Sequence, residues 1–115
     1  MNSIYLINVE SFKLTVNEAL AMVETEIDSL RLLNKHVVLK VVHGYGSSGS
    51  GGEIKKHLPI FLSQLKAKNK IIDFVSNSSF SSLNQKYKTY TKMFPELVLD
   101  KDLANLNPGI TLIFL

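Results

Sequence analysis

The residues best suited to chemistry in this sequence lie in one glycine-rich stretch, residues 43–53, which begins with His43. Five of the chain's six glycines fall inside it. Glycine lets the backbone adopt positive φ and approach a ligand closely, and successive N–H groups ahead of a helix form a concavity that binds anions. The stretch therefore predicts a phosphate site formed by Gly44, Tyr45, Gly46, Ser47, Ser48, Gly49, Ser50, Gly51 and Gly52.

His43 stands at the mouth of this stretch, and its imidazole allows two interpretations. A histidine titrates near neutral pH, so it is suited to acid–base chemistry or to contacting a phosphate. Its ring nitrogens are equally suited to hydrogen bonds with the loop backbone that would hold the turn. The three histidines of the chain show no metal-ligand spacing. No esterase or lactamase signature surrounds the serines, so we expect them to donate hydrogen bonds to a phosphate.

The residues from Gly44 to Gly49 also match the GxGxxG pattern of dinucleotide-binding proteins. That fingerprint expects an acidic residue at the end of the following strand, whereas Asp73 falls in the middle of the predicted one. A Walker loop is disfavoured too, because no Gly-Lys-Ser/Thr sequence follows. We therefore expect a phosphate site rather than a dinucleotide cofactor.

Hydrophobic periodicity places the glycine-rich stretch between a strand at 36–43 and a helix from near Glu53 to about Lys68. Pro59 falls inside that helix and predicts an irregular start or a kink. An apolar run at 4–9 predicts a buried first strand, and similar runs predict strands at 71–75 and 110–115.

Two further helices have recognisable starts. Thr15 and Glu18 form a capping box, and Asn84 is placed to cap a helix that Pro95 ends. Residues 76–82 and 100–109 are predicted as loops. The resulting order, βαβαβαβ, predicts one domain over residues 1–115, with an at least partly parallel sheet and helices packed on it.

The charge of the chain is unevenly distributed. Residues 54–94 carry eight lysines and one acidic residue, a balance of +7, whereas residues 1–53 and 95–115 each have a balance of −2. A concentrated basic region favours nucleic acid, DNA or RNA, and we expect non-specific attraction from Lys55, Lys56, Lys86 and Lys88. The alternative is that these lysines only solvate exposed helix faces. Tyr45 and Phe80 would stack on bases if they are exposed.

The composition also limits where the protein is expected to act. The chain has no cysteine, which excludes disulfides and thiolate metal sites and suits a reducing cytoplasm. No apolar stretch approaches the roughly 20 residues that a membrane span needs, and the first residues do not resemble a signal peptide. We therefore expect a cytoplasmic protein with no membrane partner.

Three parts of the chain resemble the Smr (small MutS-related) domain family: residues 14–20, residues 39–46 with their His-Gly-Tyr-Gly corner, and Gly51 before a helix opening at Ile54. The resemblance covers about residues 5–75, and a long loop together with residues 107–111 is similar to a bacterial stand-alone subgroup. It implies a two-layer α/β sandwich with a mixed, mostly parallel four-stranded sheet, like the C-terminal domain of a bacterial translation initiation factor. It also implies nucleic-acid binding and, in many members, endonuclease or nicking activity.

One motif of that family is altered here. Its Leu-Asp-x-His sequence corresponds to residues 9–12, where Glu10 stands in for the aspartate and Phe12 replaces the histidine. In members with nuclease activity this acid–histidine pair is implicated in cleavage. The resemblance therefore supports a site that binds the nucleic-acid backbone and leaves an enzyme uncertain.

Three functions remain open from the sequence. The leading hypothesis is a nucleic-acid-binding domain that holds phosphate at the glycine-rich stretch, with His43 in contact. A nuclease would use the same site, with His43 as acid–base and Glu10 positioning water or a metal such as Mg²⁺ or Mn²⁺. A nucleotide-binding or protein-interaction module would leave the lysines as solvated surface. A domain of this size is also compatible with action beside a larger protein partner.

Overall fold

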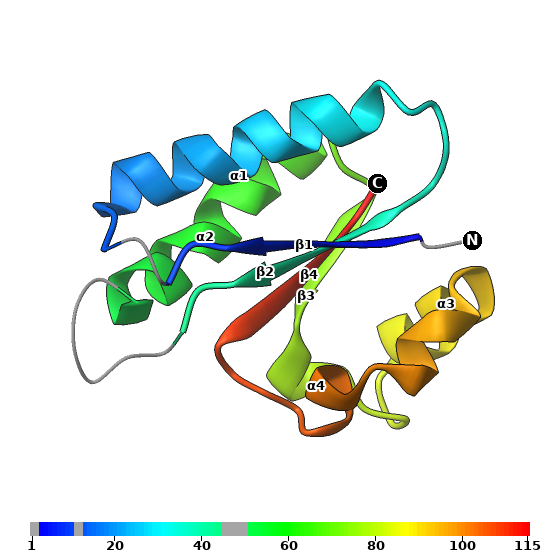
Figure 1. Cartoon of the computed structure of the whole chain (residues 1–115). Helices are drawn as coiled ribbons and strands as arrows, with labels where there is room; N and C mark the ends of the chain where they lie inside the picture. The colour runs from blue at the N-terminus through cyan, green and yellow to red at the C-terminus, as the bar shows by residue number, and fades with distance from the viewer. Residues whose placement is uncertain (1–2, 11–12, 45–50) are drawn as a thin grey trace.

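A four-stranded mixed sheet lies between two groups of helices in the computed structural model, which describes residues 3–10, 13–44 and 51–115 (Figure 1). The elements along the chain are β1 (Ile4–Asn8), α1 (Val16–Arg31), β2 (Val38–Val42), α2 (Gly51–Ala67), β3 (Asp73–Ser76), η1 (Asn77–Ser79), α3 (Gln85–Met93), η2 (Pro95–Leu99), α4 (Lys101–Ala104) and β4 (Ile110–Phe114), where η denotes a 3₁₀ helix.

The strands are ordered β1-β2-β4-β3. β1 and β2 are parallel, whereas β4 is antiparallel to both of its neighbours. The sheet is mixed as expected, but the expectation of mostly parallel pairing is wrong. The reason is that the chain leaves β3 and enters β4 at the same end of the sheet, so β4 must run in the opposite direction to β3.

Helices cover both faces of the sheet, so the two-layer prediction is also wrong. One hydrophobic cluster joins α1 and α2 to the sheet, with Val23 and Leu58 among its buried members. A second cluster joins α3, η2 and α4 to the other face, where Tyr90 stacks on Phe114 with ring centroids 3.7 Å apart. The connections from β1 to β2 and from β2 to β3 advance in one direction across the sheet, and their common handedness places α1 and α2 on the same face.

Local capping signals are confirmed. Thr15 Oγ1 accepts from the Glu18 N–H at 3.2 Å, and the Thr15 N–H donates to Glu18 Oε1 at 2.9 Å. Asn84 Oδ1 accepts from the Lys86 N–H at 2.7 Å and caps α3. Pro59 lies in the interior of α2, which continues on both sides of it.

The segment 100–109 is not wholly irregular, because it contains α4, and the βαβαβαβ order therefore gains a further helix. Asp100 Oδ1 caps this helix by accepting from the N–H groups of Asp102 and Leu103, at 2.9 and 3.2 Å. Asp100 Oδ2 also accepts from Lys40 Nζ at 2.9 Å. This ion pair to a buried lysine ties α4 to the middle of the sheet. In the segment 76–82, residues 77–79 form η1 instead of a loop.

The first strand is not buried as expected. β1 lies at the edge of the sheet, and the side chain of Leu6 is 62% exposed. Leu6 is on the face that α3 and α4 cover, and that cover does not bury it. At the opposite edge, β3 begins at Asp73 rather than at residue 71, so Asp73 is its first residue and not its middle.

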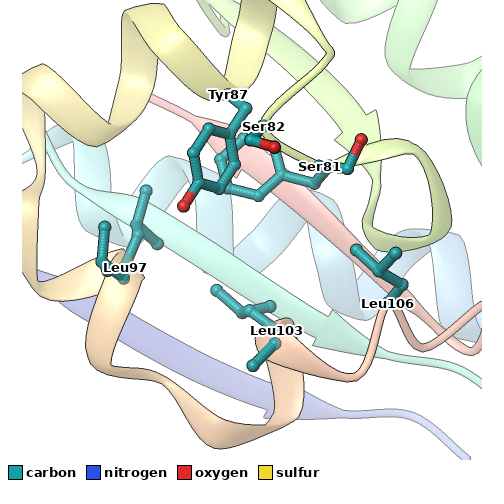
Figure 2. A pocket seen from close by; sticks show the side chains of 9 residues that line it. Ser81, Ser82, Tyr87, Leu97, Leu103 and Leu106 are labelled. Carbon is teal, nitrogen blue, oxygen red and sulfur yellow. The ribbon is translucent and has the colours of Figure 1, made fainter.

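The helices between β3 and β4 also enclose a pocket on the face away from α1 and α2 (Figure 2). Side chains from the segment after η1, from α3, from η2 and from α4 line it.

Candidate functional site

The parallel strands β1 and β2 end side by side, and the residues that follow them meet at the carboxyl end of the sheet. The Val9 N–H donates to Val42 O at 2.9 Å, so the chain passes directly from this pairing to Glu10 on one strand and to His43 on the other. The carboxyl end of parallel strands is where α/β proteins place their ligands. We call Glu10, His43, Gly44 and residues 51–56 of α2 the glycine corner.

Gly44 and Glu10 are in contact at this corner. Gly44 has a φ of +72°, in the left-handed region that favours glycine. A Cβ atom added there would lie 2.8 Å from Glu10 Cδ and would collide with Glu10 Oε2. The Glu10 carboxylate is the end of an exposed, flexible side chain and can move aside, so the positive φ is what favours glycine at position 44. The structure brings these two predicted site residues together.

The ring of His43 is 1% exposed, and both of its nitrogens have partners. Nδ1 lies 2.6 Å from Gly44 O, and Nε2 lies 2.9 Å from Thr111 Oγ1. A carbonyl oxygen can only accept, so Nδ1 carries the proton and the Thr111 hydroxyl donates to Nε2. Of the two interpretations of His43, this geometry favours the one in which the ring holds the turn.

Electrostatics at the corner also favour a neutral His43. Burial lowers the pKa of His43 below its ordinary value, and the nearby positive charge of Lys55 lowers it further. The hydrogen bond to Gly44 O and the negative charge of Glu10 oppose this effect without cancelling it. Glu10 and Lys55 thus both lie close enough to His43 to act on its charge.

The corner rests on the start of β4. Gly109 O accepts from the N–H groups of both His43 and Gly44, at 2.9 and 3.1 Å. The Gly109 N–H donates in turn to Asn107 Oδ1 at 2.8 Å. Sequence reasoning gave no role to Gly109 or Thr111. The available signal was a single hydroxyl, Thr111, in an otherwise apolar final strand.

Lys55 and Lys56 lie in the beginning of α2, and both side chains are exposed. Neither forms an ion pair with any residue that the structure describes, whereas neighbouring Glu53 contacts His57 at 3.5 Å. Gly51 and Gly52 are the first two residues of the helix. The predicted site residues Tyr45, Gly46, Ser47, Ser48, Gly49 and Ser50, as well as Phe12, lie outside the described residues.

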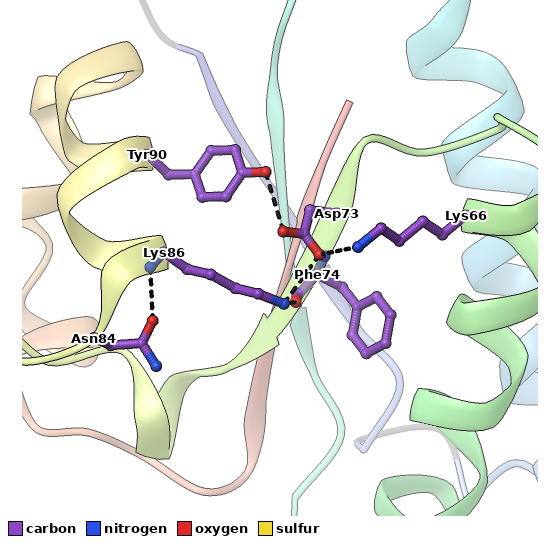
Figure 3. Close-up of polar contacts among 6 residues, drawn as sticks. All are labelled: Lys66, Asp73, Phe74, Asn84, Lys86 and Tyr90. Carbon is purple, nitrogen blue, oxygen red and sulfur yellow. Dashed lines mark hydrogen bonds and ion pairs between the residues drawn. The ribbon is translucent and has the colours of Figure 1, made fainter.

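The structure does not bring Lys86 and Lys88 to the glycine corner. Both belong to α3, on the other face of the sheet (Figure 1). Lys86 Nζ contacts Asp73 Oδ1 at 3.0 Å and Phe74 O at 2.8 Å (Figure 3). Asp73 pairs with Phe114, at the opposite end of β4 from the corner.

Asp73 is the centre of a polar cluster at this amino end of the sheet (Figure 3). It is 9% exposed and also accepts from Lys66 Nζ at 3.1 Å and from the Tyr90 hydroxyl at 3.2 Å. Burial alone would raise the pKa of Asp73, but hydrogen bonds from Lys86, the Phe74 N–H and Lys66 outweigh it and hold this pKa below its ordinary value. Burial and the charge of Asp73 raise the pKa of Tyr90 to about 12. The cluster therefore stabilises the fold with Asp73 ionised.

Phe80 does not meet the condition for base stacking, because its ring is 2% exposed. Within the described ranges, no helix is long and apolar enough to cross a membrane. Comparisons with protein-family models, curated proteins and solved structures find no match to this chain. The resemblance to Smr domains thus stays a prediction carried by the residues quoted for it.

Proposed function

We propose that this protein binds nucleic acid through its phosphate backbone at the glycine corner. The observation that carries the proposal is the pair Lys55 and Lys56, exposed and without ion-pair partners in the described structure, in the beginning of the helix that follows the glycine-rich stretch. Charged side chains that the protein does not pair internally are available to a charged ligand. Phosphate is the anion that such a corner accommodates best.

Two helix ends add to this positive environment. α1 follows β1 and α2 follows β2, so the amino termini of both helices lie at the carboxyl end of the sheet. A helix amino terminus carries about half a positive charge and directs free N–H groups outward. The proposal includes an Smr-like fold related to the C-terminal domain of a bacterial translation initiation factor. In this proposal His43 stabilises the turn at Gly44 and does not itself contact the nucleic acid.

The test is the salt dependence of binding, measured by fluorescence anisotropy with labelled duplex DNA and labelled single-stranded RNA. Each lysine that contacts a phosphate contributes about one to the slope of log K against log salt. We expect the Lys55→Ala/Lys56→Ala variant to lose about two from this slope. The matched control, Lys88→Ala/Lys92→Ala, removes the same charge from exposed positions on α3 and should leave the slope unchanged.

Equal losses in the two variants would show that the lysines act only through net charge, and the proposed site would be wrong. Binding of a mononucleotide that does not depend on salt would favour the nucleotide-binding module instead. Thermal unfolding of each variant, followed by circular dichroism, controls for loss of the fold.

The nuclease remains a second candidate because Glu10 lies against Gly44, directly beside His43. No group of three or more histidine, cysteine, aspartate or glutamate side chains in the described part of the chain is placed to hold a metal ion. We therefore derive no step through a metal ion. Cleavage of the same labelled substrates that is lost in Glu10→Gln would support this candidate.

A further inference from the structure

A cavity of about 310 Å³ opens on the face of the protein that α3, η2 and α4 cover (Figure 2). This volume is at the lower end of the range of small-molecule sites. We propose that the cavity binds a small, uncharged, largely apolar molecule that carries a hydrogen-bonding group. The proposal is independent of nucleic-acid binding at the glycine corner.

The absence of charge in the cavity wall defines the class of ligand. None of the described residues that line it is charged; the apolar part of the wall includes Leu97, Val98, Leu103 and Leu106. An ionic ligand would lose hydration here without gaining an ion pair, which is strongly unfavourable. An uncharged apolar molecule would instead gain from removing its own surface and that of the leucines from water.

Hydroxyl groups supply the polar part of the site. Ser81, Ser82 and Tyr87 line the cavity, and none of their hydroxyls has a hydrogen-bond partner among the described residues. A hydroxyl both donates and accepts, so the three groups can bind an alcohol, a phenol or a carbonyl. The Tyr87 ring packs on Phe80 with centroids 5.1 Å apart and planes tilted by 58°, which gives the cavity an aromatic wall suited to a flat ligand.

Leu106 provides a further reason to regard the cavity as a site. Its φ is +50°, and its N–H donates to Leu103 O at 3.2 Å at the end of α4. Helix ends normally place glycine in this conformation, because a side chain there is strained. Leucine instead contributes a side chain to the cavity wall. Among the described residues, Lys13, Asn34 and Asn69 also have positive φ, and Leu106 is the one of these that lines the cavity.

The test uses naphthol as an uncharged probe and naphthoate as its anionic counterpart, added separately to the isotope-labelled full chain. Amide chemical shifts report where each probe binds. We expect naphthol to saturate shifts at Ser81, Ser82, Tyr87 and Leu103 and to leave Gly44 and Lys55 unaffected. Naphthoate should bind at least tenfold more weakly, because the cavity offers no positive charge.

Three variants separate binding from folding. Ala104→Leu enlarges a side chain at the exposed rim of the cavity and should weaken naphthol binding, while nucleic-acid binding stays unchanged. Leu106→Gly removes part of the wall but also relieves the strained φ, so we expect weaker naphthol binding with little change in Tm. The matched control is Leu99→Ala, which removes an apolar side chain that is 82% exposed and outside the cavity wall, and it should bind naphthol normally.

Several results would overturn the proposal. These are no saturable shift with naphthol, equal affinity for naphthoate, or undiminished binding to Ala104→Leu. Sedimentation measurements give a fourth: association of two chains that protects the cavity residues would show that its occupant is a second copy. Tyr87→Phe keeps the ring and should weaken naphthol binding about fivefold if its hydroxyl contacts the ligand; an unchanged affinity would contradict the assigned polar contact.

Discussion

The two ends of the central sheet both carry lysines and use them differently. At the amino end, Lys66 and Lys86 share the buried carboxylate of Asp73. Lys70, in the same region, contacts Glu24 at 2.9 Å and Asp28 at 3.0 Å. At the carboxyl end, Lys55 and Lys56 have no ion-pair partner in the part of the chain that the structure describes. All five belong to the same basic segment of the sequence. Lys68, which follows α2 at the amino end, is an exception, because it is exposed and has no ion pair among the described residues.

Helix direction explains much of this difference. α1 and α2 end at the amino end of the sheet, where the negative ends of their dipoles and the acidic side chains favour Lys66 and Lys70 for structural reasons. Lys86 lies in the first turn of α3, against the dipole of that helix, and its ion pair with Asp73 accounts for it. The same helices begin at the carboxyl end, where a lysine adds to positive charge that is already present. Lys55 and Lys56 are placed against that preference without such an ion pair among the described residues, which is why we propose that they serve a ligand.

The largest expected effect is at the amino end, where Asp73→Ala would leave two lysines and the Tyr90 hydroxyl without their acceptor. Removing one partner of a buried polar cluster costs about 3 kcal/mol of unfolding free energy. Urea denaturation measures this loss. Nucleic-acid affinity should be unchanged, because the cluster lies at the other end of the sheet.

Asp28→Ala is the control for this comparison. It removes a carboxylate that is 52% exposed from an ion pair with Lys70, and we expect a change within about 0.5 kcal/mol. A similar loss in both variants would mean that burial of Asp73 does not distinguish the two ion pairs.

The next effect is at the carboxyl end. Gly44→Ala introduces a side chain at a φ of +72°, and we expect it to cost about 2 kcal/mol because of this backbone conformation. Urea denaturation of Gly44→Ala, Glu10→Ala and the double variant gives the coupling between the two positions. Because the exposed carboxylate can move aside, we expect the two losses to add within about 0.5 kcal/mol. A larger coupling would show that Glu10 is held against Gly44 in solution.

Local signals in the sequence predicted much of this fold. The capping signals at Thr15 and Asn84 and the glycine-rich stretch each depend on only three to ten neighbouring residues. The helices that begin beside them lie where the sequence predicted. Sheet order and layer number depend on contacts between distant segments, which periodicity does not encode. Asp100 was an overlooked cap, because its helix is only four residues long.

The same distinction applies to the candidate site. The sequence placed Glu10, His43 and Gly44 in one site, and the structure brings them together. It could not choose between the interpretations of His43, because the partner of Nε2 is Thr111, 68 residues along the chain. The sequence analysis also grouped Lys86 with Lys55, because the ion pair between Lys86 and Asp73 depends on the folded structure and not on the local sequence.

The pH dependence of stability distinguishes the two ends further. His43 has a folded pKa below its ordinary value of 6.5, so the unfolded chain binds the proton more tightly. Its contribution is present above pH 6.5 and is lost as the pH falls through the folded pKa, with a slope of at most about 1.4 kcal/mol per pH unit. Asp73 also has a lowered pKa, so its contribution is lost at lower pH, below its ordinary value of 3.8.

Urea denaturation at a series of pH values checks both ranges: the upper window, below pH 6.5, where His43 titrates, and the lower window, below pH 3.8, where Asp73 titrates. His43→Gln keeps a polar side chain that does not titrate and should flatten the curve in the upper window while the lower one persists. Asp73→Asn should do the reverse. A wild-type curve that is flat from pH 7 to the lower window would contradict a buried, neutral His43.

The smallest expected effect is on affinity and separates the two candidate functions. Glu10 adds a negative charge to a corner that we propose binds phosphate. If the protein only binds, Glu10→Gln should tighten nucleic-acid binding about fivefold at low salt, because it removes repulsion worth about 1 kcal/mol between exposed charges. Fluorescence anisotropy with the labelled duplex measures this change, and added salt should reduce it.

Glu53→Gln is the matched control, since it removes the same charge from the first turn of α2 where Glu53 contacts His57 rather than Gly44. A tightening confined to Glu10→Gln would place the bound phosphate beside Gly44. Equal tightening in both variants would show an effect of net charge alone and would contradict a bound phosphate next to Glu10. Weaker binding of Glu10→Gln would contradict the expected repulsion between Glu10 and the phosphate, and cleavage lost in the same variant would favour the nuclease.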